Sequence, residues 1–469
     1  MKNFLILSAI ILIFFSCNRF QNTKTGELSF ENDSLFFDTI FTYVGSTTKF
    51  IKVYNKNNYP ITIDKIMLAG GESSPYRLNI DGVASTTAED IYLDAKDSIF
   101  IFAEVTIDPK KDDLIVDDSI IFLSGENRQR IVLESVGMDV HLISGEIIPS
   151  QTWVNDKPYL IYHSVMIDTN EILTIDPGVQ IYMHHDSYFM VAGQLVANGN
   201  LENPIIWRGD RIDDDYYLNK PGQWKGLAFL PGSHDNYLNY VEVNEGTYGI
   251  IVDSTINQTV PTLFVNNSKI QHCSYIGLLG HNTGITVTNT VIADCGFNNV
   301  ALFSSGTYQF FHCTIQNEYS YSVRNSPAVG IQNFNLDDNQ HPVYQGFISA
   351  LFVNSIIYGN LKNEFVVKAY DTTNSLSFTF RNCLMKLDLE SNDTSSTLFQ
   401  NIIVNKDPKF ISSSEFDYHL DVGSPAIGKA DFNIDNLNSS ILRYDIDGID
   451  RLLDSKTDIG AYEYVPDTQ

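Results

Sequence analysis

The chain contains little cysteine, with five residues in a length of 469. A secreted scaffold held together by disulfides is far richer in cysteine, so this class of protein is excluded. One of the five, Cys17, belongs to an apolar N-terminal segment. The other four are Cys273, Cys295, Cys313 and Cys383. Because these four fall at equivalent places in a repeat described below, we expect them to stack inside a core rather than to bind metal or act as nucleophiles.

Basic charge is also scarce, with 30 lysines and arginines against 57 acidic residues and a net charge of −27. Such a surface repels nucleic acid, which we do not expect as a partner, and suits neutral glycans, cations or basic proteins. The sequence has no glycine-rich phosphate loop, no nucleophile elbow and no His/Cys metal spacing. These absences favour a binding protein over an enzyme, with no cofactor expected other than the calcium considered below.

The chain has one long apolar run, at its N terminus, and no other stretch that is long and apolar enough to be transmembrane. Residues 4–15 are too few to span a bilayer comfortably and are typical of an export signal. The run ends in Phe14-Phe15-Ser16-Cys17, which resembles a bacterial lipobox, although the large Phe15 departs from the usual pattern. We predict a lipoprotein signal peptide at 1–17, with lipid on Cys17, and a polar tether at 18–26. An ordinary signal peptide or an uncleaved anchor is the alternative.

Residues 27–141 carry the period-two alternation of apolar and other side chains that indicates half-buried β-strands. The expected strands are 50–55, 61–68, 99–107, 119–123 and 129–136. About seven short strands separated by turn signals predict a two-sheet sandwich. The run Asn58-Tyr59-Pro60-Ile61-Thr62-Ile63 resembles bacterial Ig-like modules related to the sperm-protein/Hydin group. That resemblance implies a spacer or a protein-contact domain.

A tetrapeptide of the form polar-small-x-aliphatic recurs through the second half of the chain. Its copies are Asn267-Ser268-Lys269-Ile270, Asn289-Thr290-Val291-Ile292, His312-Cys313-Thr314-Ile315, Asn354-Ser355-Ile356-Ile357 and Asn382-Cys383-Leu384-Met385, with a weaker, earlier copy aligned at Asn239-Tyr240-Val241-Glu242. The copies recur at intervals of roughly 20–50 residues, which is the period of a solenoid. We expect aliphatic and phenylalanine ladders inside the coils and a ladder of asparagines at the bends.

Residues 145–465 are therefore predicted to form a right-handed parallel β-helix. Short apolar strands at 165–167, 173–175 and 179–182 begin the region, and Pro177-Gly178 makes a tight corner before the last of them. Short strands with sharp corners, and no amphipathic helix of any length, fit this fold. The predicted fold class is all-β, with an Ig-like sandwich followed by the solenoid.

Several motifs of this region resemble known families. Residues 172–179 look like the opening coil of the pectate-lyase-like β-helix superfamily, and residues 200–205 and 222–227 resemble coils of a Bacteroidota-type surface lipoprotein group. Between Asp407-Pro408-Lys409-Phe410 and Asp458-Ile459-Gly460-Ala461-Tyr462-Glu463, the chain is similar to a C-terminal choice-of-anchor segment, which predicts a capping segment at about 405–465 that closes the end of the helix. The resemblance implies a fold and a cell-envelope location, but no assigned reaction.

Two acidic strings are candidate calcium sites, because hard cations prefer clustered carboxylates. The candidate ligands are Asp210, Asp213, Asp214 and Asp215 in one string, and Asp445, Asp447 and Asp450 in the other. Solvated or structural loops without metal are the alternative for both. In β-helix polysaccharide lyases, calcium acidifies a uronate while a basic side chain removes the adjacent proton. Under that reading Arg211 or Lys220 is the candidate base.

We expect an outer-membrane lipoprotein of the cell envelope, displayed on the surface by analogy, that binds a polysaccharide or a surface protein. Several aromatic side chains could stack on sugar faces, namely Tyr216, Tyr217, Trp224 and Tyr319 to Tyr321. A calcium-dependent polysaccharide lyase or a glycoside hydrolase is the first alternative, and a structural or assembly component is the second. Acidic side chains from adjacent coils that converge with one Arg or Lys would favour the enzyme.

Overall fold

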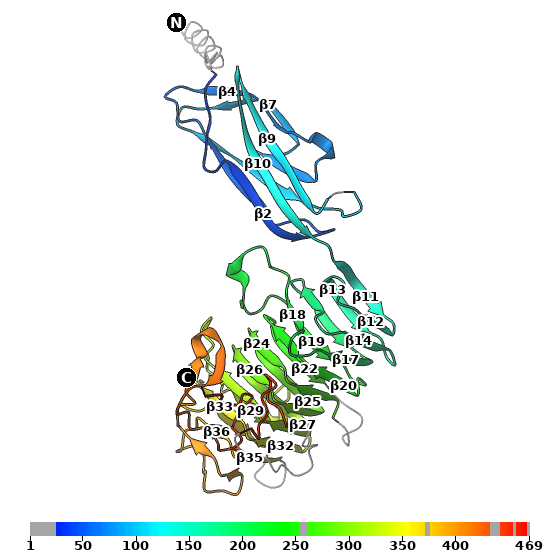
Figure 1. Ribbon diagram of the computed structural model, residues 1–469, viewed down its shortest axis with the longest axis vertical. Helices are drawn as coiled ribbons and strands as arrows, with labels where there is room; N and C mark the ends of the chain where they lie inside the picture. Colours follow the sequence, from blue (N-terminus) through cyan, green and yellow to red (C-terminus); the bar gives the residue numbers. More distant parts are fainter. Residues whose placement is uncertain are drawn as a thin grey trace, which may run out of the picture. The chain divides into compact units, whose positions relative to one another are not determined.

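The structure is a computed structural model that describes residues 25–111, 113–253, 261–370, 376–431, 441–453 and 456–466. The chain divides into two compact units, Met1–Asp139 and Val140–Gln469, and each has its own core (Figure 1). The predicted signal peptide with Cys17, and residues 18–24 of the predicted tether, lie outside the described residues. No helix in the described part of the chain is long and apolar enough to cross a membrane.

The N-terminal unit contains two five-stranded sheets. In spatial order, one sheet consists of β1 (Ser29–Phe30), β3 (Lys49–Tyr54), β8 (Ser98–Val105), β5 (Tyr76–Ile80) and β6 (Val83–Ala84). The other consists of β2 (Ser34–Phe41), β10 (Asn127–Met138), β9 (Ile115–Ser124), β4 (Ile61–Leu68) and β7 (Thr87–Leu93). Neighbouring strands are antiparallel except β2 and β10, which are parallel. A 3-10 turn, η2 (Gly71–Ser73), follows β4.

Alternate residues of both sheets fill one core. In β8, Ile99 and Ile101 are buried whereas Phe100 and Phe102 point outward, and from the other sheet Ile131 and Leu133 join the same core. The five strands predicted from period two are confirmed, with ends that differ by a few residues. The sequence missed five short or edge strands, in which few side chains alternate long enough to be recognised.

The second unit is built on a 26-stranded sheet in which strands pair in parallel with the strand one coil further along. Strand β13 (Tyr159–Ile167), for example, pairs with both β15 and β16, and β14 pairs with β17. This pairing winds the chain into a parallel β-solenoid with three strand faces. The opening strands are β11 (His141–Ile148), β12 (Gln151–Trp153) and β13.

The strand pairings define three stacks of strands, which make up the faces. Figure 1 shows strands of successive coils lying side by side along the solenoid. The first face contains β16 (Tyr188–Val191), β19 (Gly226–Phe229), β22 (Tyr248–Asp253), the beginnings of β25 (Ile276–Thr288) and β27 (Asn298–Phe311), β29 (Val329–Gln332) and β34 (Phe365–Lys368). The second face contains β14 (Ile172–Ile175), β17 (Gln194–Asn198), β20 (Asn236–Asn239), β23 (Leu263–Asn266), the ends of β25 and β27, β32 (Ile348–Val353), β35 (Leu376–Arg381) and β37 (Phe399–Gln400). The third face contains β15 (Gln180–Met183), β18 (Ile205–Gly209), β21 (Val241–Asn244), β24 (Lys269–Cys273), β26 (Val291–Cys295), β28 (Thr314–Asn317), β33 (Ile356–Gly359), β36 (Leu384–Met385) and β38 (Ile403–Val404). Outside these faces lie the hairpin β30 (Phe334–Leu336) and β31 (Pro342–Tyr344), the 3-10 turns η3 (Asp215–Tyr217) and η4 (Ser413–Glu415), and the hairpin β39 (Phe410–Ser412) and β40 (Asp417–Leu420).

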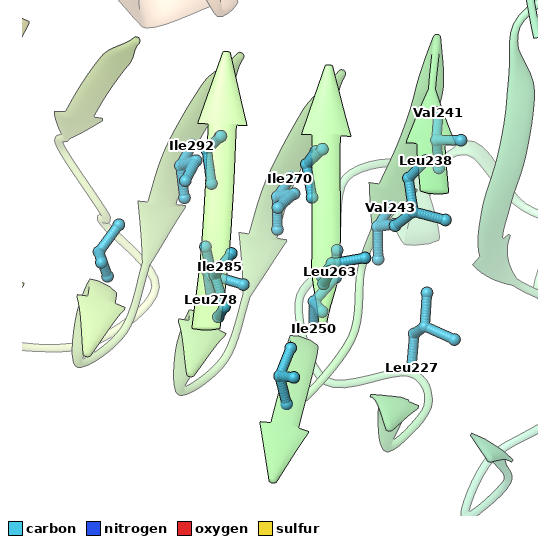
Figure 2. Close-up of a cluster of buried hydrophobic side chains, with 14 of the residues drawn as sticks. Leu227, Leu238, Val241, Val243, Ile250, Leu263, Ile270, Leu278, Ile285 and Ile292 are labelled. Carbon is cyan, nitrogen blue, oxygen red and sulfur yellow. The ribbon is translucent and has the colours of Figure 1, made fainter. Parts of the chain in front are cut away.

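In-register ladders of apolar side chains fill the inside of the coils. Figure 2 shows Leu227, Ile250 and Leu278, which come from successive strands of the first face and pair in register. On the second face, Phe310, Phe352 and Phe380 stack with ring centroids 4.6 and 4.8 Å apart. A single coil cannot bury these side chains by itself, so stacking of neighbours provides the core. The expected internal ladders are confirmed.

The bend before the third face requires a residue with a left-handed backbone. The leading residues of the tetrapeptides have positive φ: Asn267 (46°), Asn289 (47°), His312 (51°), Asn354 (52°) and Asn382 (51°). Asparagine adopts this conformation at lower cost than most other residues. In the earlier copy the left-handed residue is Tyr240 (φ 47°), because Asn239 pairs with Asn266. The predicted alignment of that copy at Asn239 is therefore wrong by one residue.

Side chains at these bends also form hydrogen bonds between neighbouring coils. Asn239 donates to Asn198 over 2.9 Å, and Asn266 donates to Asn239 over 3.0 Å, so the expected asparagine ladder is confirmed. In the second tetrapeptide position, the Ser355 hydroxyl donates to the carbonyl of Val353 and accepts the N–H of Cys313 from the preceding coil. The position therefore needs a small side chain with a donor, which Ser, Thr and Cys provide.

The four cysteines of the solenoid are buried, unpaired thiols. Cys313 and Cys383 fill the second tetrapeptide position, and each thiol is directed at the carbonyl two residues earlier. Cys273 and Cys295 repeat this geometry at a second place and pair in register on neighbouring strands. Burial raises the pKa of the Cys313 and Cys383 thiols to about 12, which disfavours the reactive thiolate. The expectation of stacked core cysteines is confirmed.

The C-terminal segment lies along one side of the coils, rather than only at their end as predicted. Leu420, Ala426 and Ile459 pack on Ile356 and Leu384 of the third face. Further along the same face, a second cluster joins Val291 and Ala293 to Tyr418, Ile446, Ala461 and Tyr462. Figure 1 shows the segment in orange and red beside these strands. We call the described residues of this segment, 405–431, 441–453 and 456–466, the cover.

Candidate functional site

Two loops leave the coils at the corner between the third and the first face, and a buried carboxylate holds each of them. The first loop, 210–225, lies between β18 and β19. Glu245 of the following coil accepts hydrogen bonds from Arg208 (2.8 Å) and from the N–H groups of Gly209 (3.0 Å) and Asn219 (2.9 Å). Burial raises the pKa of Glu245, and Arg208 acts against this shift. The Glu245 carboxylate thus holds the loop both where it begins, at Gly209, and further along, at Asn219.

The second loop, 318–328, lies between β28 and β29 and is held in the same manner. Arg324 and Glu364 form an ion pair over 2.6 Å with side chains that are 1% and 0% exposed. Glu364 also accepts the N–H groups of Ala328 and Leu361, both over 2.8 Å. Five hydrogen bonds run from Arg324 to Glu364, Asn360, Ser326 and Asn317, so this buried ion pair ties the loop to the coils at several points. No pattern in the sequence indicates this role of Glu364, since glutamates in turns are normally solvated.

Between the two loops, three aromatic rings follow one another along successive coils. Tyr248, Tyr275 and Phe297 each stand at the start of a first-face strand, and backbone hydrogen bonds link their coils. The Tyr248 and Tyr275 ring centroids lie 5.4 Å apart, and those of Tyr275 and Phe297 lie 4.9 Å apart. Tyr275 is 40% exposed, so one ring of this aromatic row is open to solvent.

The loops meet over this corner. Tyr321 donates a hydrogen bond to the carbonyl of Asn219 (3.3 Å), and the Lys220 ammonium lies 3.9 Å from the Tyr216 ring centroid and 5.2 Å from that of Tyr321. Tyr216 and Tyr321 remain 62% and 47% exposed. Two aromatic residues predicted as sugar platforms, far apart in sequence, therefore lie around one cation.

A groove of about 300 Å³ continues from the aromatic row along the first face. Phe297 belongs to both features. The lining consists of Phe297, Asn298, Phe303, Asn325, Ser326, Pro327, Gly330, Ile331, Gln332, Val366 and Lys368. Apolar rings, amides and one cation make up this lining, and none of these described residues is acidic.

The floor beside the groove is a row of outward apolar positions. Successive strands of the first face pair in register through Ala228, Ile251, Leu279, Ala301, Gly330 and Val366. Ile251, Leu279 and Val366 are half-buried, and no other described segment packs on them in an apolar cluster. A flat apolar strip flanked by aromatic rings is the kind of surface to which the apolar faces of sugars bind.

Not every predicted aromatic residue belongs to this site. Trp224 is fully buried and its indole N–H donates to the carbonyl of Asn244 (2.8 Å), so it is a core residue. Tyr319 is 7% exposed. Tyr217 lies under the Arg211 guanidinium, 3.7 Å from its carbon. Of the aromatic residues predicted to stack on sugars, Tyr216 and Tyr321 are the two that the structure describes with exposed rings at this corner.

The carboxylates of the first candidate calcium site are turned to separate partners. Asp210 contacts Nδ1 of His184 over 2.6 Å, and Asp213 accepts two hydrogen bonds from Arg211 (2.7 and 3.2 Å). Asp214 caps η3 by accepting the N–H of Tyr216 (2.9 Å), and Asp215 is exposed. Of the two candidate bases, Arg211 is thus engaged with Asp213, and Lys220 lies over tyrosine rings.

The second candidate calcium site is a turn within the cover. Asp445 is 1% exposed and accepts the N–H groups of Asp447, Ile449 and Glu463. Asp450 pairs with Arg443. Asp447 lies 2.6 Å from Nε2 of His419, and this contact, together with Asp417, raises the pKa of His419 to about 9. Among all residues that the structure describes, no three His, Cys, Asp or Glu side chains are arranged to hold a metal ion.

Comparisons with known proteins add little. No family model and no curated protein matches the chain. Among solved structures, a family 123 glycoside hydrolase from Clostridium perfringens, described in work on glycolipid glycan hydrolysis, matches with a TM-score of 0.17 and 9% identity. The match covers 22% of this chain and 23% of that one. A similarity of this size carries no conclusion about fold or activity.

Proposed function

We propose that the protein is a non-catalytic binding protein that holds a glycan against the first face of its solenoid. The observation that supports this function best is the set of half-buried apolar positions Ile251, Leu279 and Val366 on the first face, on which no described segment packs in an apolar cluster, flanked by the aromatic row and the two held loops. A site held by buried ion pairs loses little entropy when a ligand binds. Hydrolysis of a glycosidic bond would need two carboxyl groups across the bond, and the groove lining contains none.

The rest of the proposal concerns the cellular location and the domain architecture of the protein. The N-terminal unit would be an Ig-like spacer, and the solenoid a right-handed parallel β-helix of the pectate-lyase-like kind. Lipid on Cys17 would anchor the chain to the outer membrane of a bacterial cell envelope, with 18–26 as the tether. Such an arrangement would present a long, rigid face to a polysaccharide away from the membrane.

Affinity electrophoresis of the purified chain through gels that contain single polysaccharides tests this function. We expect retardation by at least one neutral glycan, and Tyr275→Ala should weaken it roughly ten-fold because a stacking ring is lost. The matched control is Tyr370→Ala, which removes a tyrosine of similar exposure (44%) outside the groove. Equal loss in both variants, or no retention on any glycan, would contradict the proposal. Unsaturated product in an absorbance assay on acidic polysaccharides would instead favour the lyase.

A further inference from the structure

The outer face of one sheet in the N-terminal unit carries three exposed phenylalanines. Phe50 of β3 and Phe100 and Phe102 of β8 are 53%, 39% and 38% exposed. Their ring centroids lie 5.7, 6.0 and 6.2 Å apart, so the rings form one patch. The neighbouring residues Ile51 and Ile101 point into the core, so the patch is not needed to fill it. Clustered exposed rings of this kind usually mark an interaction site.

Lysines flank the phenylalanine patch without a carboxylate partner among the described residues. The Lys52 ammonium lies 5.1 Å from the Tyr54 ring centroid and 5.2 Å from that of Phe100, and the Lys56 ammonium lies 6.0 Å from the Tyr54 ring. In a chain with a net charge of −27, unpaired cations beside an apolar patch are unusual. They complement a partner that is both acidic and apolar.

The edge of the sheet beside this patch lacks a paired strand along part of β3, where the Lys49 ammonium donates to the carbonyl of Phe36 in β2 (2.8 Å). Strand β1 pairs only with Val53 and Tyr54 of β3. In the part of the chain that the structure describes, no strand pairs with the outer edge of β3 from Lys49 to Lys52. An open edge offers main-chain hydrogen bonds to an added strand, and the adjacent side chains select which strand is added.

We propose that this edge and patch bind an extended polypeptide segment as an added β-strand, with apolar and acidic side chains at alternate outward positions. Phe50 and Lys52 are two residues apart and point to the same side of the sheet. An added strand would place an apolar residue beside Phe50 and a Glu or Asp beside Lys52. Cross-strand pairs of these kinds stabilise sheets. This site is independent of the glycan groove.

The probe is the peptide acetyl-Thr-Leu-Thr-Glu-Thr-Leu-Thr-amide, titrated into the full chain by fluorescence anisotropy. It places Leu, Glu and Leu on one side and is too short to fold alone. We expect saturable binding, and we expect Phe50→Ser to weaken it roughly ten-fold. The matched control is Ile115→Ser, which removes a 72% exposed residue of the other sheet and should leave binding unchanged.

A charge swap makes the test specific. Lys52→Glu should lose the Glu peptide and gain a peptide with Lys in place of Glu, because the cross-strand pair is restored. A peptide with alternate N-methyl groups should not bind, since main-chain pairing is blocked. Absent binding, unchanged affinity in Lys52→Glu, or full binding of the N-methyl peptide would overturn the proposal. If the chain dimerises with rising concentration and Phe50→Ser abolishes this, the patch binds a second copy of the chain. If the chain is retained on anionic vesicles and Lys52→Glu abolishes this, the patch binds a lipid surface. Either result would also overturn the proposal.

Discussion

The first and the third face of the solenoid are built by the same rules, yet the described cover lies on only one of them. On the third face, the outward residues Val291, Ile356 and Leu384 are each 0% exposed beneath the cover. On the first face, Ile251, Leu279 and Val366 occupy comparable outward positions and remain half-exposed. The strand pairing and the internal ladders are the same in kind.

The difference lies in polar groups that tie the cover to the coils. Arg451, which is 0% exposed, donates to Glu463 (2.7 Å) and to Asn289 (3.0 Å), the leading residue of a tetrapeptide. The N–H of Ala461 donates to the hydroxyl of Thr314 (3.0 Å). A row of apolar side chains on the outside of a sheet is stabilised when another segment packs on it, and on the third face the cover does so. On the first face, no described segment fills that position, and we propose that a glycan does.

The largest effect is expected where the cover is tied to the third face. Arg451→Ala removes one partner of a buried ion pair and leaves Glu463 uncompensated, which costs about 3–5 kcal/mol. Thermal unfolding monitored by circular dichroism should show the loss in the transition of the solenoid.

Its matched control is Arg443→Ala, which breaks the partly exposed pair with Asp450, where the arginine is 41% exposed. Because solvent screens such a pair, we expect its loss to lower the melting temperature much less than Arg451→Ala does. Similar destabilisation by both variants would mean that the cover is not held by the buried network.

A second pair of variants compares the two faces directly. Leu384→Ala opens a cavity between the third face and the cover and should cost about 2–5 kcal/mol. Leu279→Ala, on the uncovered first face, should cost less than about 1 kcal/mol, while it weakens retention on glycan gels. Urea unfolding of both variants measures the difference. Equal costs would show that the first face is also covered in solution.

The repeated tetrapeptide predicted most of the solenoid because its residues respond to local geometry. Asn267 and its counterparts satisfy a left-handed bend, and Ser355 satisfies two neighbouring backbone groups. Such requirements recur with every coil and are therefore visible in one sequence. The earlier copy was misaligned at Asn239 because Tyr240 takes the bend without the residue type that normally signals it.

The site could be predicted only in part. Exposed Tyr216 and Tyr321 were recognised as aromatic candidates, but their meeting through Lys220 depends on loops that are 102 residues apart at Asn219 and Tyr321. The buried glutamates that hold the two loops, Glu245 and Glu364, were not predicted, because burial of a glutamate follows from three-dimensional packing and leaves no pattern in the sequence. For the same reason the motifs at 407–410 and 458–463 did not reveal that the cover lies along the third face.

The pH dependence of stability should also separate the covered face from the open one. Asp294 of the third face accepts the Tyr418 hydroxyl of the cover, and burial raises its pKa to about 6. The folded state therefore binds this proton more tightly than the unfolded state, whose carboxyl titrates near 4. The contribution is present at low pH and is lost as the pH rises through about 6, by up to ~3 kcal/mol. Asp294→Asn should flatten the plot of the free energy of unfolding against pH between pH 4 and 6. An unchanged slope in this range would contradict the prediction.

The smallest effect is expected from calcium. In the loop at the edge of the open face, Asp210 and Asp213 already contact His184 and Arg211, and Asp214 caps η3. A calcium ion would have to break these contacts before it gained its six to eight oxygen ligands. Calorimetry of the chain with Ca²⁺ and then with EDTA should therefore give the same melting temperature. Since 1 kcal/mol of binding would move that temperature by roughly 1–2 °C in a unit of about 330 residues, a larger calcium-dependent rise would show that the loop rearranges around an ion and would reopen the case for a lyase.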